Sequence, residues 1–150
     1  TLKQNIGVFA RPLEKDAIHL EMRLGLGAWE TMVRDGYVIA DDDATEELEI
    51  HALVNSAQIG AEFNLAAMGL IKKNVTWGVR AALMQPFYHD VDTELTGVQL
   101  LNTEFEAVLG VELAKWASLD YQLKVERTPL IHEEWAVING LLLSLNANIL

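Results

Sequence analysis

Apolar and polar residues alternate along most of the chain. The clearest run is 18–27, Ile-His-Leu-Glu-Met-Arg-Leu-Gly-Leu-Gly, in which apolar residues occupy every second position. Side chains of a β-strand point alternately to opposite faces of a sheet, whereas apolar residues at this spacing would spread around the whole circumference of a helix. The pattern therefore predicts a strand with one apolar face and one polar face.

The same alternation recurs along the rest of the chain and predicts about seven strands. The expected strands are 3–10, 16–31, 51–71, 74–86, 98–113, 117–127 and 133–150. Proline lacks the donor that a sheet ladder needs, and the three prolines fall at or beside expected turns: Pro12, Pro86 and Pro129. Short links at 11–15, 72–74 and 114–116 alternate with longer ones at 35–49 and 87–97 and an intermediate one at 128–133. Short turns on one side and longer loops on the other are typical of outer-membrane barrels.

Composition limits the classes of function but does not select a compartment. The 150 residues carry a formal net charge of -11, which argues against a nucleic-acid partner because phosphate binding needs a basic surface. The absence of cysteine excludes disulfides, thiolate zinc sites and thiol catalysis. No apolar run reaches the roughly 18 residues expected of a transmembrane helix.

The apolar faces of the expected strands contain no Asp, Glu, Lys or Arg. A charge that faces lipid at mid-membrane costs about 2–4 kcal/mol, so a lipid-facing surface should be free of charge, although the core of a soluble barrel would be free of it too. The positions that we expect to face lipid are Leu20, Leu24, Ile59, Phe63, Val79, Leu109, Val111, Leu123, Leu141 and Leu143.

The positions of glycine and tryptophan favour a membrane. The polar faces carry Gly25, Gly27, Gly60, Gly78, Gly110 and Gly140. On the outside of a soluble barrel these glycines would weaken the strands, whereas inside a narrow barrel they leave room for bulky side chains across the lumen. Trp77, Trp116 and Trp135 lie near strand ends, where aromatic residues form girdles at membrane–water interfaces. Trp29 departs from this pattern, because its parity puts it on the polar face.

The polar faces are predominantly acidic. The expected lumen-lining residues are Glu21, Arg23, Glu62, Arg80, Glu104, Glu106, Glu112, Asp120, Lys124 and Glu126. Rings of acidic side chains select cations, so one interpretation is a cation-preferring pore. The other is a plugged barrel in which Arg23 and Arg80 pair with glutamates. A barrel of about eight strands favours the plugged form, because its interior holds little beyond side chains.

These observations predict an all-β fold, an antiparallel up-and-down transmembrane β-barrel formed by residues 1–150 as a single domain. Single-chain bacterial barrels usually have an even number of strands. We therefore expect eight or more strands in the complete barrel, with at least one before Thr1 or unrecognised within the chain. The alternative is a soluble lipocalin-like barrel, which turns its apolar faces inward and binds an apolar ligand.

A family resemblance accompanies this pattern. The region from 102–105 through 119–125, followed by Glu134-Trp135 and 139–145, resembles the C-terminal half of a group of uncharacterised Gram-negative outer-membrane barrel proteins, the broad family that includes salt-induced outer-membrane proteins. The resemblance depends on the strand pattern. It implies a location in the bacterial outer membrane, with the lipid bilayer as partner, and carries over no functional residues. One departure is the end 148–150, Asn-Ile-Leu, where such barrels often carry an aromatic residue.

The motifs predict no catalytic residue, metal site or cofactor. A Ser–His–acid triad could draw on four histidines and on Ser56, Ser118 and Ser144, but no serine lies at matched height beside a histidine in the expected strands. The acidic run Asp41-Asp42-Asp43 lacks the glycine and spacing of an EF-hand calcium loop, so a solvated loop is the simpler interpretation. The sequence therefore predicts a structural or pore-forming barrel that is not an enzyme.

Overall fold

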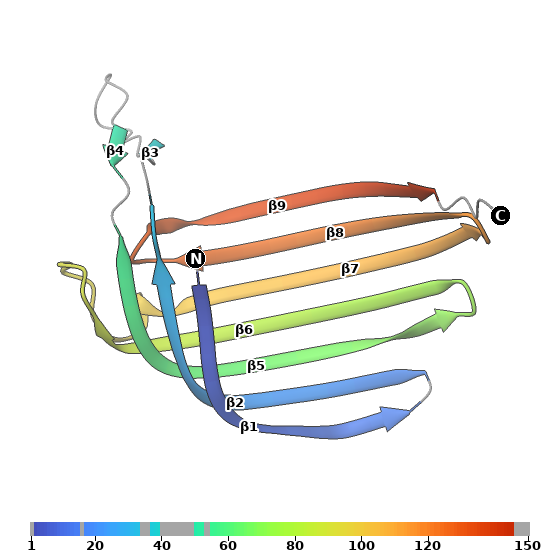
Figure 1. Ribbon diagram of the computed structural model, residues 1–150, viewed down its shortest axis with the longest axis horizontal. Helices are drawn as coiled ribbons and strands as arrows, with labels where there is room; N and C mark the ends of the chain where they lie inside the picture. The colour runs from blue at the N-terminus through green and yellow to red at the C-terminus, as the bar shows by residue number, and fades with distance from the viewer. Residues whose placement is uncertain (1, 16, 34–36, 40–49, 53–54, 146–150) are drawn as a thin grey trace.

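The computed structural model describes residues 2–15, 17–33, 37–39, 50–52 and 55–145. They form a seven-stranded antiparallel sheet in the order β1-β2-β5-β6-β7-β8-β9 (Figure 1). Its strands are β1 (Leu2–Lys15), β2 (Ile18–Thr31), β5 (Ser56–Lys72), β6 (Val75–His89), β7 (Asn102–Ala114), β8 (Ala117–Thr128) and β9 (His132–Leu145). A separate ribbon pairs β3 (Tyr37–Ile39) with β4 (Ile50–Ala52) in the connection between β2 and β5.

The sheet is open at its two edges, β1 and β9, which do not pair with each other over the described residues. The all-β, up-and-down antiparallel arrangement that the alternation predicts is confirmed, and closure into a barrel is not shown. A short 3-10 helix, η1 (Gly97–Leu100), lies between β6 and β7. Within the described residues, no helix has the length and apolar character needed to cross a membrane.

Short turns lie at one end of the sheet and longer connections at the other (Figure 1). The short turns link β1 to β2, β5 to β6 and β7 to β8. The opposite end carries the β2–β5 and β6–β7 connections and the turn 129–131. The predicted alternation of lengths holds, but the first turn was expected at 11–15, which instead extends β1. The acidic run 41–43 lies outside the described residues.

Two prolines lie inside strands rather than at turns. Pro12 lies in β1, where the register with β2 shifts between Ala10 and Leu13. Pro86 lies in β6 beside the register shift opposite Gly60. An edge strand and a bulge are the two places where a strand tolerates a residue without an N–H donor, so proline alone did not mark a turn. Pro129 follows β8, as expected.

Two expected strands have different beginnings. The range 51–71 is interrupted, because β4 ends at Ala52 and β5 begins at Ser56. The range 98–113 begins with η1, and β7 starts at Asn102. Gly97 has a φ of 56°, a left-handed conformation that glycine adopts without steric cost. The chain therefore turns at Gly97 before it enters the sheet.

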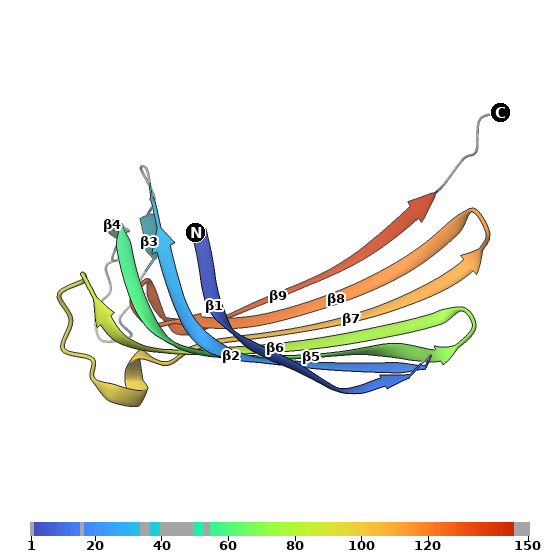
Figure 2. The same ribbon diagram turned by 60° about the horizontal axis from the view of Figure 1, so that its bottom comes forward.

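The sheet is bent into a trough (Figure 2). β1, β2 and β5 turn upward at one end, and β8 and β9 rise at the other. Gly7 and Gly25 face each other across the β1–β2 pair. A Cβ on either residue would collide with the backbone of the other strand. Glycine therefore permits the close approach of the two strands at this position.

Few apolar side chains are buried among the described residues. They are Trp29, Ala82, Met84, Leu100, Ala117 and Leu130. The accessible surface is 11062 Å². A compact monomer of this mass would expose only about 7,600 Å². The sheet thus leaves extensive surface uncovered, and its chemical character differs between the two faces.

Candidate functional site: the polar concave face

The pairing register gathers the expected lumen residues on one face of the sheet. One cross-strand row contains Glu21, Arg80, Glu106 and Lys124. The next row contains Arg23, Glu104 and Glu126. The same face, by parity, carries the remaining three expected lumen residues: Glu62, Glu112 and Asp120. This face is the concave one, since Lys3 on β1 reaches across the trough to Glu104 on β7.

The expected lipid-facing residues have the opposite parity and lie on the convex face. Leu20, Val79 and Leu123 share one row, while Ile59, Phe63, Val111 and Leu141 lie in the rows on either side. Leu24, Leu109 and Leu143 are 60%, 41% and 55% exposed. Large apolar side chains are therefore presented outward rather than enclosed.

The three expected interface tryptophans also lie near the ends of the sheet. Trp77 is the third residue of β6 and, with Trp116 in the 115–116 turn, belongs to the short-turn end. Trp135 lies near the start of β9, at the opposite end. Trp116 and Trp135 are exposed. The two ends of the apolar face thus both carry indole rings.

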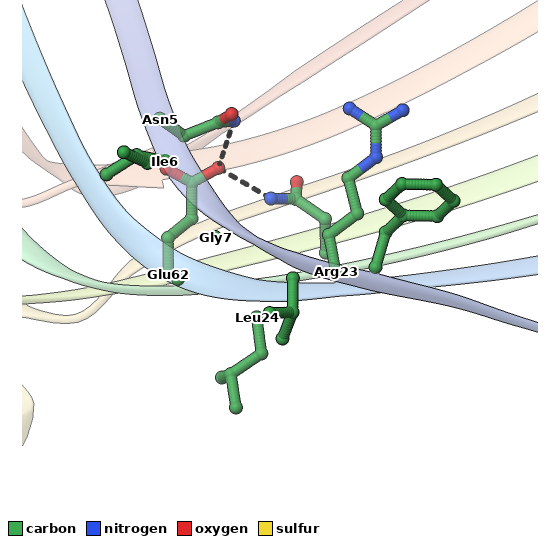
Figure 3. A pocket seen from close by; sticks show the side chains of 10 residues that line it. Asn5, Ile6, Gly7, Arg23, Leu24 and Glu62 are labelled. Atoms are coloured by element: carbon green, nitrogen blue, oxygen red, sulfur yellow. Dashed lines mark hydrogen bonds between the residues drawn. The ribbon is translucent and has the colours of Figure 1, made fainter.

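A buried carboxylate, Glu62 on β5, connects three strands. Only 6% of its surface is exposed. Its Oε1 accepts hydrogen bonds from the side-chain amides of Asn64 at 2.5 Å and Asn5 at 3.4 Å (Figure 3). Its Oε2 accepts one from Nε1 of Trp29 at 3.4 Å. Burial of an anion is costly unless donors converge on it, and here three neutral donors from β1, β2 and β5 do so.

Gly27 leaves the space that this carboxylate occupies. A Cβ at this position would collide with Oε2 of Glu62. We expect Gly27→Ala to displace the carboxylate and lower the free energy of unfolding by about 1–3 kcal/mol, as for overpacking or an unsatisfied buried group. The matched control is Gly140→Ala, because a Cβ there meets nothing within 4 Å. Urea unfolding in detergent, followed by tryptophan fluorescence, measures both variants, and equal losses would contradict the expectation.

A second cluster joins β1 to β7 and β8 through charged side chains. Lys3 Nζ lies 2.6 Å from Glu104 Oε2. Lys124 Nζ lies 3.4 Å from Glu104 Oε1 and 2.7 Å from Glu126 Oε2. The Lys3 ammonium also sits 3.9 Å from the centre of the Trp29 ring, a cation–π contact. Trp29 is only 5% exposed and touches both clusters.

Further polar contacts extend over the same face. Arg11 and Arg23 both contact the carboxylate of Glu21, at 3.0 Å and 2.6 Å. Gln122 donates to Glu106 at 2.7 Å. The expected pairing of arginines with glutamates therefore holds for Arg23. It was wrong for Arg80, which has no carboxylate within ion-pair distance among the described residues, although Glu106 is its neighbour in the row.

Several residues of this face were missed by the sequence analysis. Lys3 and Asn5 were missed because no faces were assigned to the expected strand 3–10. Gln58 and Asn102 are fully buried, and the Asn102 amide donates to Gln58 Oε1 at 2.8 Å. The one signal in the sequence was the parity of Trp29, which placed a large apolar ring among polar residues.

The described residues offer little for catalysis or metal binding. No three His, Asp or Glu side chains in this part of the chain gather closely enough to hold a metal ion. Ser118 Oγ donates to Asp120 at 3.3 Å, and Ser56 Oγ is buried without a hydrogen-bond partner. What the face can do chemically is present charges and hydrogen-bonding groups along the trough.

Comparisons with protein-family models, curated proteins and solved structures give no match to this chain. The resemblance to salt-induced outer-membrane proteins therefore stays a prediction from the strand pattern. Function has to be inferred from the chain's own faces, contacts and charges.

Proposed function

We propose that this chain forms the wall of a transmembrane β-barrel in the bacterial outer membrane, with its convex face toward lipid and its concave face toward a polar lumen. One observation carries the proposal. Large apolar side chains such as Leu24 and Leu143 are exposed on the convex face, while charged and amide side chains pack together on the concave face. This distribution is the reverse of that in a water-soluble barrel.

The dimensions of the apolar face support the proposal. On β5 the outward positions from Ile59 to Gly69 hold only Ile, Ala, Phe, Leu and Gly. They span about 33 Å of strand at about 3.3 Å per residue. At a tilt of about 40° this corresponds to a height of about 25 Å, the height of the apolar band of outer-membrane barrels. Trp77 and Trp116 at one end, and Trp135 at the other, suit the two aromatic girdles.

The lumen in this proposal is largely filled rather than wide. Glu62 binds the side chains of three residues, and the Lys3 and Lys124 ammonium groups occupy the space between β1 and β8. Barrels of about eight strands have interiors that side chains can fill. We therefore favour a structural barrel of low conductance with an acidic interior over an open pore.

A carrier of apolar ligands agrees less well with the concave face. The hollow of about 290 Å³ beside Glu62 is lined in part by Asn5, Arg23 and Asn64 (Figure 3). An apolar ligand there would leave a carboxylate, amides and a guanidinium facing it without water. Most of the large apolar side chains lie on the convex face, although Phe9, Ile138 and Leu142 share the parity of the concave face.

Closure of the sheet requires further backbone. With seven antiparallel strands, β1 and β9 run in the same direction. An antiparallel barrel therefore needs an odd number of additional strands between these edges, and one is the minimum. Unpaired backbone groups cannot remain in hydrocarbon, so a bilayer would demand this closure.

The test is whether the chain, together with the strand that closes the sheet, folds into a bilayer. We expect it to require detergent in solution and to acquire β-structure on addition of short-chain phosphatidylcholine vesicles, as seen by circular dichroism. Brominated lipid should quench the fluorescence of Trp116 and Trp135, both of which are exposed near the ends of the sheet. A protein that is monodisperse without detergent and ignores the vesicles would refute the proposal.

A further inference from the structure

Two strands that are far apart in the sheet touch across the trough. β1 and β7 are separated by β2, β5 and β6. Three intervening strands make four inter-strand spacings of about 4.8 Å, so β1 and β7 lie roughly 19 Å apart along the sheet. Nevertheless, Lys3 Nζ and Glu104 Oε2 are 2.6 Å apart. The bend of β1 brings its first residues over β7, so the contact crosses the concave space (Figures 1 and 2).

This contact belongs to a continuous chain of side chains from β5 to β8. The Glu62 carboxylate accepts from the Trp29 indole, and the Trp29 ring lies against the Lys3 ammonium. Lys3 pairs with Glu104, which also contacts Lys124, and Lys124 pairs with Glu126. We call this series, Glu62, Trp29, Lys3, Glu104, Lys124 and Glu126, the crossbar.

The crossbar stands between two hollows of the concave face. One, of about 290 Å³, is lined in part by Asn5, Arg23 and Glu62. The other, of about 370 Å³, is lined in part by Lys3, Lys124 and His132. Glu62 borders the first hollow, and Trp29, Lys3, Lys124 and Glu126 border the second. In a closed barrel, an ion that moved between the two hollows would pass close to these side chains.

We propose that the crossbar is the constriction of the lumen and that Lys3 determines its ion preference. This inference rests on the proposed barrel. Three carboxylates of the crossbar, Glu62, Glu104 and Glu126, are opposed by Lys3 and Lys124. Loss of the Lys3 charge leaves Glu104 with one cation instead of two and raises the negative charge at the narrowest place. Carboxylates at a constriction select cations, so the passage becomes more cation-selective.

The experiment compares Lys3→Met with Arg11→Met in planar bilayers. Methionine retains the apolar stem beside Trp29 and removes only the charge. Arg11 lies on the same strand, but it pairs with Glu21 on the adjacent strand β2 and does not cross the trough. We expect Lys3→Met to raise unit conductance roughly twofold or more and to shift the reversal potential toward cations, because a filled narrow lumen loses a blocking charge. Arg11→Met should retain the parental values.

Insertion is measured first, as lipid-dependent β-structure, which separates the two proposals. If the parent does not insert, the barrel itself is refuted. If all variants insert, and Lys3→Met has the same conductance and reversal potential as the parent and Arg11→Met, the proposed constriction is refuted. The same conclusion holds if none of the inserted proteins conducts. Should Lys3→Met fail to fold, Lys3→Gln provides the second variant, because glutamine removes the charge and keeps a polar donor near Glu104. A shift of the reversal potential toward cations is expected, and parental values would contradict the assignment.

Discussion

Leu123→Arg is expected to lower the equilibrium constant for folding into vesicles about 30- to 700-fold. Leu123 lies in the middle row of the convex face, aligned with Ala107 and Val79. An arginine that faces lipid near the bilayer midplane costs about 2–4 kcal/mol, and each 1.4 kcal/mol is a factor of ten. Equilibrium folding into vesicles across a urea series, monitored by circular dichroism, measures the change.

The adjacent residue supplies the control for this experiment. Gln122 has the opposite parity, and its amide donates to Glu106 at 2.7 Å. Gln122→Arg introduces the same side chain on the concave face, where it can pair with that carboxylate. Its folding should stay close to that of the parent. If both arginines are tolerated equally, or if Gln122→Arg is the more harmful, the convex face does not meet lipid.

Glu62→Leu is expected to reduce the free energy of unfolding by about 2–5 kcal/mol. Leucine removes the acceptor of three hydrogen bonds and leaves the amides of Asn5 and Asn64 and the indole of Trp29 without a partner. Each buried donor without an acceptor costs about 1–3 kcal/mol. Chemical unfolding in detergent micelles measures the loss, and the midpoint should fall without a change of slope.

Glu62→Gln distinguishes lost hydrogen bonds from lost charge. Glutamine has nearly the same shape and keeps one oxygen for the donors of Asn5 and Asn64. We expect the loss of unfolding free energy in Glu62→Gln to be less than half of the loss in Glu62→Leu. If the two variants are equally unstable, the negative charge is what matters at this position, and the account based on neutral donors is wrong.

Alternation predicted most of the sheet because the period of two is a local property of strands. The run 18–27 became part of β2, and the face of each residue followed from its parity. Boundaries were less accurate where the chain departed from the ladder. Pro12 lies inside β1, since an edge strand with an irregular register tolerates it, and η1 occupies the start of an expected strand.

The polar face was predicted as a set of residues but not as a set of contacts. The list of glutamates and arginines followed from parity, yet nothing in it indicated that Arg23 pairs with Glu21 while Arg80 has no carboxylate within reach among the described residues. Pair contacts depend on rotamers and on the bend of the strands, which alternation does not encode. Trp29 illustrates this, because its parity was known but its role between Lys3 and Glu62 was not.

By itself the sequence determined that the chain forms up-and-down strands with one apolar and one polar side, because side-chain direction alternates with each residue of an extended backbone. Only the tertiary structure decided which side is concave and which residues meet across it. The curvature of the sheet brings Lys3 to Glu104, although 101 residues separate them along the chain. Curvature arises from the sum of twist, close glycine contacts and register shifts over many strands, so no local pattern contains it.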